Sequence, residues 1–129
     1  MLPLFVYGTL RPGERAWRWY LGRLAVRHRP GLLDGYGLYG RTRPFPFAAP
    51  APGLAVVGEL VWVEPGAGEP VLRRLDEYEG AVGPDPLYLR EQAEIITDEG
   101  PRNAWVWVAG TRLRPDPGEL IVSGDWLGR

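Results

Sequence analysis

Residues 69–80 read EPVLRRLDEYEG, a segment with the periodicity of one short amphipathic helix. At about 100° per residue, its apolar side chains fall on a single arc: Val71, Leu72, Leu75 and Tyr78. The charged residues point elsewhere, and Arg73 and Glu77 have the i, i+4 spacing of a helical ion pair. Gly80 marks the helix stop. The sequence therefore predicts a helix over 69–80 that packs its apolar arc against a core.

Glu79 stands out within this helix because it projects between Leu75 and Leu72, on the core side. It also lies at the C-terminal end, where the helix macrodipole is negative. Burial and the dipole both disfavour the ionised form, so we expect the pKa of Glu79 to be raised toward neutrality. Such a carboxyl can act as a general acid or base at pH 7. A frayed last turn that swings Glu79 into water is the alternative, and the pattern alone leaves both open.

The composition limits the fold and the chemistry. A chain of 129 residues predicts a single domain spanning 1–129, and 18 Gly and 14 Pro favour turns and short elements. Without cysteine there is no thiol nucleophile and no zinc–thiolate site. The single histidine, His28, is expected to be solvated between Arg27 and Arg29, which argues against a histidine-based triad or a multi-histidine metal site. We expect no metal and no cofactor.

The charges and the hydropathy limit the partners. All 15 basic residues are arginine, so lysine Schiff-base chemistry is excluded. A net charge of −1 gives no general preference for polyanions, and we expect no nucleic-acid partner. The start of the chain lacks the charged region of a signal peptide, and no apolar run approaches the roughly 20 residues that span a bilayer. We therefore expect no membrane association, a cytoplasmic location, and a monomer or weak homodimer.

Short strands with one or two helices are predicted along the rest of the chain. The expected strands are Leu2–Tyr7, Leu24–His28, Leu32–Tyr39 with a turn or bulge at Asp34-Gly35, Leu54–Val63, and a hairpin of Leu87–Thr97 and Asn103–Ala109. A brief helix is expected over Glu14–Leu21. Four prolines predict a long stiffened loop over Arg41–Gly53. We expect the Leu120–Arg129 tail to pack back through Ile121, Val122 and Trp126. The mixture indicates an α+β fold, with the strands closed into a small barrel.

Two motifs about 70 residues apart, FVYGTL at Phe5–Leu10 and LDEYEG at Leu75–Gly80, resemble those of the gamma-glutamylcyclotransferase superfamily. Tyr88–Arg90, Val106–Val108 and Ser123–Trp126 match further family positions, so the resemblance covers essentially the full chain. The form with threonine at position 9 resembles the branch of the gamma-glutamylamine cyclotransferases and the butirosin-pathway cyclotransferase. Two departures, the proline-rich loop and a tryptophan pair at Trp105 and Trp107, leave the leaving group open.

The resemblance implies a mixed-strand barrel with peripheral helices and a metal-independent reaction on a small gamma-glutamyl substrate. The alpha-amine of a gamma-glutamyl group attacks its own side-chain carbonyl, which forms pyroglutamate (5-oxoproline) and expels an amine. The resemblance also implies that Glu79 is the acid/base. It further implies that the pocket is lined by four consecutive residues: Tyr7, Gly8, Thr9 and Leu10. Taken alone, without the second motif, those four residues favour an ordinary turn after a strand.

Other candidates carry two interpretations each. Tyr88 can donate a hydrogen bond to Glu79 or to substrate, or can be a core residue. Arg11 and Arg90 can pair with a substrate carboxylate, although solvated surface positions are expected for both. Glu59 is a second carboxylate candidate, expected to face outward, and the alternation of Trp105 and Trp107 is typical of strand packing.

Two functions besides the cyclotransferase are compatible with the chain. Because a fold does not fix a function, the same barrel can be a non-catalytic module that binds a small ligand or a protein partner. Six tryptophans and 15 arginines also suggest a nucleic-acid-binding barrel, but the net charge and the dispersed arginines argue against it.

Overall fold

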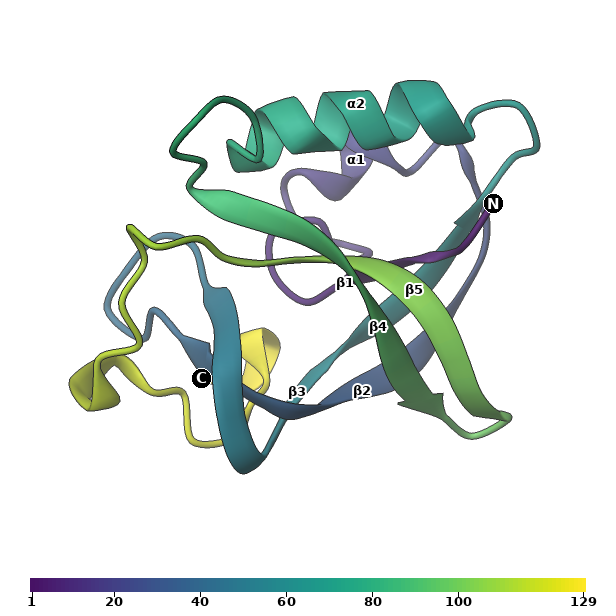
Figure 1. Ribbon diagram of the computed structural model, residues 1–129. Coiled ribbons are helices and arrows are strands. Elements are labelled where there is room, and N and C mark those ends of the chain that lie inside the picture. The colour runs from purple at the N-terminus through teal and green to yellow at the C-terminus, as the bar shows by residue number, and fades with distance from the viewer.

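The computed structural model describes residues 1–129, in which five strands form a closed barrel in the order β1-β3-β2-β4-β5 (Figure 1). The strands are β1 (Leu4–Val6), β2 (Ala25–Tyr39), β3 (Phe47–Val63), β4 (Tyr88–Thr97) and β5 (Gly100–Ala109). The helices are α1 (Trp17–Tyr20) and α2 (Gly68–Glu79), with 3-10 turns at Pro117–Glu119 and Trp126–Gly128. The predicted α+β barrel with peripheral short helices is confirmed.

The short strand β1 closes the barrel because it lies between two other strands. It pairs antiparallel with β3, where Leu4 faces Val61, and parallel with β5, where Leu4 faces Trp105. The remaining pairs are antiparallel: the long β2–β3 pair, the predicted β4–β5 hairpin, and the β2–β4 pair, which is matched at Leu32 and Ile96. A three-residue strand with neighbours on both sides is fully buried, so β1 fixes where its C-terminal end emerges.

Helix α2 lies across one end of the barrel (Figure 1) and matches the prediction within one residue. Its core face is buried as expected through Val71, Leu72 and Leu75. Gly80 adopts a left-handed conformation with φ 68°, which ends the helix and is favourable only for residues such as glycine. Tyr78 was predicted on the buried arc but is 36% exposed, because it lies beyond the edge of the core. No helix is long and apolar enough to cross a membrane.

The predicted loop over Arg41–Gly53 is wrong in its second half. From Phe47 onward these residues belong to β3, and Pro50 pairs with Tyr36 on β2. The strand tolerates proline here because β1 pairs only with residues 59–61 of β3, so residues 47–57 have a strand neighbour on one side only. A missing N–H on the unpaired side costs no ladder hydrogen bond.

The two strands predicted around Pro30-Gly31 are one continuous strand, β2. Pro30 lies opposite Glu59 of β3, while β4 reaches β2 only at Leu32, so the same one-sided pairing accommodates this proline. The predicted bulge at Asp34-Gly35 is confirmed by a register shift and by a positive φ of 81° at the glycine.

The apolar side chains form two clusters on the two faces of β1. Leu4 and Val6 pack with the core face of α2, while Phe5 and Tyr7 pack with the opposite cluster. The C-terminal tail folds back as predicted through Ile121 and Trp126, which belong to the second cluster, but Val122 is exposed. The brief helix predicted over residues 14–21 is limited to the four residues of α1.

Candidate active site

A cavity of about 200 Å³ lies between the C-terminal end of α2 and the segment that follows β1. All six residues predicted for the site line it: Tyr7, Gly8, Thr9, Leu10, Glu79 and Tyr88. The rest of the lining is mainly apolar, contributed by Phe5, Val6, Phe45, Pro46, Leu87 and Trp107, together with Arg15 and Tyr78. Strand β1 and helix α2 therefore bring the two sequence motifs to one cavity.

Glu79 is the carboxyl group of this cavity. Its side chain is partly exposed, and because Glu79 lines the cavity, that exposed surface is available to a ligand. No arginine or histidine lies within ion-pair distance, since every ion pair in the chain involves another carboxylate. Removal from water by the surrounding protein raises the pKa of Glu79 from 4.5 to about 7. The group is thus divided between its acid and base forms near neutral pH.

Two tyrosine hydroxyl groups tie the walls of the cavity together. The hydroxyl of Tyr88 donates to the backbone oxygen of Pro46 (2.6 Å). That of Tyr7 donates to the backbone oxygen of Trp107 (2.6 Å) and accepts from the N–H of Ala48 (3.1 Å). Burial, and then the nearby Glu79, raise the pKa of Tyr88, and burial raises that of Tyr7, so both are neutral at pH 7. Tyr88 therefore positions the Pro46 segment and is not hydrogen-bonded to Glu79.

The segment after β1 lines the cavity and has consecutive backbone N–H groups without a partner in the protein. Gly8 packs so closely on Pro46 that a Cβ atom would lie 2.7 Å from the proline ring, which explains why glycine is needed. The N–H groups of Gly8, Thr9 and Leu10 form no hydrogen bond within the protein, whereas the oxygen of Gly8 accepts from Arg11 (3.0 Å). Unpaired consecutive N–H groups are suited to binding an oxyanion or a carboxylate.

A further contact joins this segment directly to helix α2. The hydroxyl groups of Thr9 and Tyr78 are 2.8 Å apart and share a hydrogen bond. Tyr78 also packs on Tyr20 of α1, with ring centroids 4.7 Å apart. The residue next to Glu79 is therefore held between the loop after β1 and the first helix, which fixes the last turn of α2. The alternative of a frayed last turn does not apply.

Residues 4–128 of this chain match the protein family described as gamma-glutamyl cyclotransferase, AIG2-like. The chain belongs to that family. A gamma-glutamylaminecyclotransferase from Bos taurus is 33% identical over 120 residues, which cover 86% of this chain and 67% of the bovine protein. The suspected family is thereby confirmed.

Solved structures agree with this assignment. An uncharacterized protein from Pyrococcus horikoshii is 28% identical with a TM-score of 0.66, and the match covers 98% of this chain and 90% of that one. An AIG2-like protein from Mus musculus has a TM-score of 0.71 at 24% identity, covering 89% and 80% of the two chains, and shows a likeness of fold.

Two arginines considered as carboxylate-binding groups lie outside the cavity of this cyclotransferase family member. Arg11 was expected in solvent but is 7% exposed, because the C-terminal tail covers it and Asp125 accepts its hydrogen bond at 2.7 Å. Arg90 donates to Asp76 at 2.9 Å and stacks over Trp105 at 4.5 Å from the ring centroid. Both are engaged with the protein's own carboxylates.

Glu59 is also absent from the cavity; it lies on the face of β3 opposite the buried Gly58 and Leu60, but its side chain is largely covered there. Its side chain is 18% exposed, with Oε1 3.9 Å from Arg11 Nη2 and Oε2 3.0 Å from His28 Nδ1. His28 itself is half-exposed, as expected. Trp107 lines the cavity and donates from its indole nitrogen to Asp76 (2.9 Å), which goes beyond simple strand packing.

Sequence reasoning missed several lining residues, above all Arg15 and Phe45. Arg15 reaches the cavity because the N–H of Ala16 donates to the oxygen of Thr9 (3.0 Å), which folds the chain back after the motif. No local pattern in the sequence signals this contact. Arg15 and Glu79 are the only cation and the only carboxylate of the lining. No group of three or more His, Cys, Asp or Glu side chains gathers in an arrangement that could hold a metal ion.

Proposed function

We propose that this chain is a cyclotransferase that converts a gamma-glutamyl amine or peptide to pyroglutamate and a free amine, with Glu79 as the general acid/base. The observation that carries the proposal is the position of Glu79, an unpaired carboxyl with a pKa near 7 in the cavity formed by the FVYGTL motif. Family membership supports the reaction type, and the bovine relative's name supports a gamma-glutamyl amine as substrate.

The reaction needs proton transfer more than it needs a reactive nucleophile. The substrate's own alpha-nitrogen forms a bond to its side-chain carbonyl carbon, and the bond from that carbon to the leaving nitrogen breaks. The ammonium must lose one proton before attack and a second as the lactam N–H forms. The leaving nitrogen gains one proton as its bond to carbon breaks, and the released amine takes up the other when it becomes an ammonium in solvent. One carboxyl with a pKa near neutrality can accept the first proton and deliver it to the leaving amine. Atoms and charges balance without a metal or a cofactor.

The cavity would assist by holding the substrate curled. An intramolecular attack held in the right geometry can lower the barrier by about 7–11 kcal/mol in favourable cases. The unpaired N–H groups of Gly8, Thr9 and Leu10 are suited to bind either the carbonyl oxygen as it becomes negative or the alpha-carboxylate. The hydroxyl groups of Tyr7 and Tyr88 donate to backbone oxygens and so hold the apolar wall of the cavity in place around the curled substrate.

The direct test is product analysis. The wild-type protein is incubated with a panel of gamma-glutamyl amines and gamma-glutamyl amino acids, and pyroglutamate release is followed by mass spectrometry. We expect the wild-type protein to release pyroglutamate and the Glu79→Gln variant to release none. A thermal unfolding curve for the variant serves as the control that it is folded. Binding of panel members without product from the wild type would instead identify a non-catalytic binding module.

A further inference from the structure

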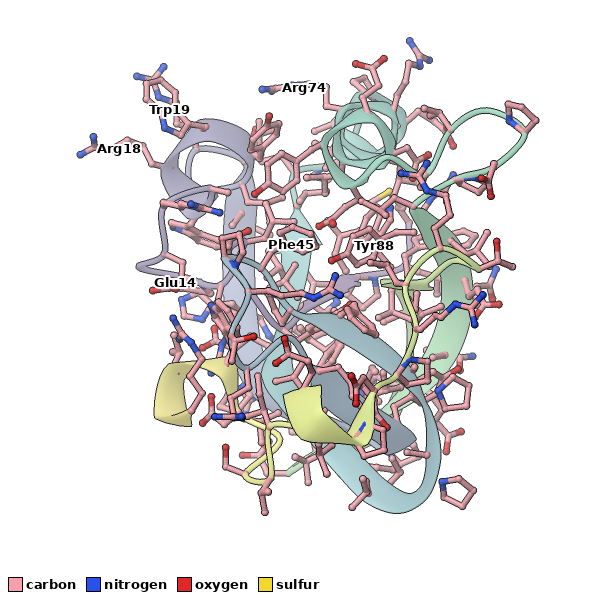
Figure 2. The ribbon with its side chains drawn as sticks, turned by 90° about the vertical axis from the view of Figure 1, so that its left-hand side faces the viewer. Glu14, Arg18, Trp19, Phe45, Arg74 and Tyr88 are labelled. Carbon is pink, nitrogen blue, oxygen red and sulfur yellow. The ribbon has the colours of Figure 1, made fainter.

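A shallow groove continues from the cavity along the two helices. It is lined by Arg15, Ala16, Trp19, Tyr20, Arg74 and Tyr78, and it shares Arg15 and Tyr78 with the cavity that contains Glu79. Figure 2 shows Trp19 and Arg18 on α1 and Arg74 extending from α2 toward the same side, with Phe45 and Tyr88 below both helices. If the glutamyl part of a substrate fills the cavity, its amine part can therefore extend into this groove.

The arginines along this path lack carboxylate partners. Arg15, Arg18 and Arg23 form no ion pair or hydrogen bond, and Arg74 donates only to the backbone oxygen of Trp19 (3.3 Å). Elsewhere, five arginines are paired with acidic side chains: Arg11, Arg27, Arg29, Arg43 and Arg90. Six others outside the groove form no ion pair: Arg41, Arg73, Arg102, Arg112, Arg114 and Arg129. Four arginines without a carboxylate partner therefore lie along or beside the groove, and two of them, Arg15 and Arg74, line it.

Acidic groups do not neutralise this region. The groove itself contains no carboxylate, and the neighbouring hollow contains one, Glu14, which forms no ion pair with any arginine. Figure 2 places Glu14 away from Arg74, toward the barrel. Uncompensated positive charge along a concave surface attracts and orients an anionic ligand.

The groove also offers apolar contact. Trp19 is 71% exposed, and the guanidinium of Arg74 lies over the ring of Tyr20, 5.1 Å from its centroid. The Arg74 stem and the two aromatic rings present flat apolar surface next to the charged groups. A ligand that fits has an apolar portion and a negative charge, rather than a second ammonium group.

We propose that this groove is the leaving-group subsite and that it selects gamma-glutamyl amides whose amine portion carries a carboxylate joined through an apolar segment. Arg15 and Arg74 bind the carboxylate, and Trp19 covers the apolar segment. The inference rests on the proposed function for its substrate and adds the chemistry of the amine that leaves. Arg15 and Tyr78 line both the groove and the cavity, and this continuity favours a part of the substrate as the occupant of the groove over an unrelated polyanion.

The test uses substrate pairs that differ only in charge. Gamma-glutamyl-phenylalanine is compared with its carboxamide, and gamma-glutamyl-6-aminohexanoate with its carboxamide, so that both a short and a long reach are sampled. We expect kcat/KM to favour the carboxylate member of at least one pair by about 5- to 10-fold, and the preference to weaken at high salt. A carboxylate-to-carboxamide ratio near one in both pairs overturns the inference but leaves the proposed function intact.

Variants assign the preference to the groove. Arg74→Gln and Arg15→Gln should each reduce the carboxylate-to-carboxamide ratio by roughly 2- to 5-fold, and Arg74→Lys should retain part of it because the charge is kept. Arg102→Gln, at an exposed position near the start of β5, is the matched control and should not change the ratio. An equal loss for both members of a pair in Arg74→Gln, with the ratio unchanged, would show a structural role and contradict the proposal.

A binding measurement separates this inference from the cyclotransferase itself. The same four compounds are titrated into Glu79→Gln protein by calorimetry, with the residues of the groove left intact. Tighter binding of a carboxylate member supports the subsite even if no pyroglutamate is released by the wild type. Equal binding of both members of each pair, whatever the turnover, overturns it.

Discussion

Glu79 and Glu59 are both held largely out of water, yet their surroundings differ in charge. Glu59 lies 3.9 Å from the buried Arg11 and 3.0 Å from His28, and Arg11 also binds Asp125. Glu79 has no cation within ion-pair distance and lines an apolar cavity, which raises its pKa to about 7. A carboxylate paired with arginine holds separate segments of the chain together, while an unpaired carboxyl with a raised pKa can exchange its proton near neutral pH.

The largest effect that separates the two glutamates is on turnover. Glu79→Gln should lower kcat for pyroglutamate release by about 10²–10⁴-fold, because the amide can neither accept nor deliver the proton. Glu59→Gln is the matched control and should keep kcat within about threefold, since its partners lie outside the cavity. Steady-state kinetics on one gamma-glutamyl amine measures both. Equal losses in the two variants would abolish the distinction.

The second effect is on stability and concerns the Glu59 side of the comparison. Arg11→Met leaves Glu59 and Asp125 without their shared cation, so the free energy of unfolding should fall by about 2–4 kcal/mol. Urea unfolding at pH 7 measures the change, with Arg102→Met as an exposed control. A loss below about 0.5 kcal/mol would show that the buried arginine is not needed to compensate these carboxylates.

The third effect is a dependence of stability on pH. With a pKa of 4.5 when unfolded and about 7 when folded, Glu79 takes up a proton on folding between these values. The free energy of unfolding therefore decreases as pH rises through this window. The pKa difference corresponds to about 3 kcal/mol, and screening by the solvent that reaches the side chain reduces the expected decrease to about 2 kcal/mol. Glu79→Gln lacks this contribution, so it should be more stable than the wild type at pH 8 and similar at pH 4. The same difference at both pH values would contradict the account.

Local patterns predicted those parts of the fold that depend on near neighbours. Helix α2 follows from its apolar periodicity and from Gly80, and the β4–β5 hairpin follows from two strand patterns joined at Gly100. The Arg41–Gly53 segment was mispredicted, because the tolerance of β3 for Pro50 depends on the absence of a second neighbouring strand. That is a property of the sheet and is not encoded near the proline.

The site shows the same division between local and distant information. The amphipathic pattern predicted that Glu79 faces the core, but its proximity to the Tyr7–Leu10 segment was expected only from the family resemblance. Arg11 was expected in solvent because its partner Asp125 is 114 residues away in the chain. Arg15 was missed because a single backbone hydrogen bond, from Ala16 to Thr9, turns it to the cavity. Contacts between distant segments decide which charges are paired.

The most direct test of the account is the pKa of Glu79 itself. Glutamate labelled with ¹³C at the side-chain carboxyl allows each group to be titrated by nuclear magnetic resonance in the wild type and in Glu79→Gln. The account predicts one glutamate carboxyl that titrates near pH 7 and is missing from the variant. A Glu79 signal that titrates near its ordinary value of 4.5 would contradict the central claim.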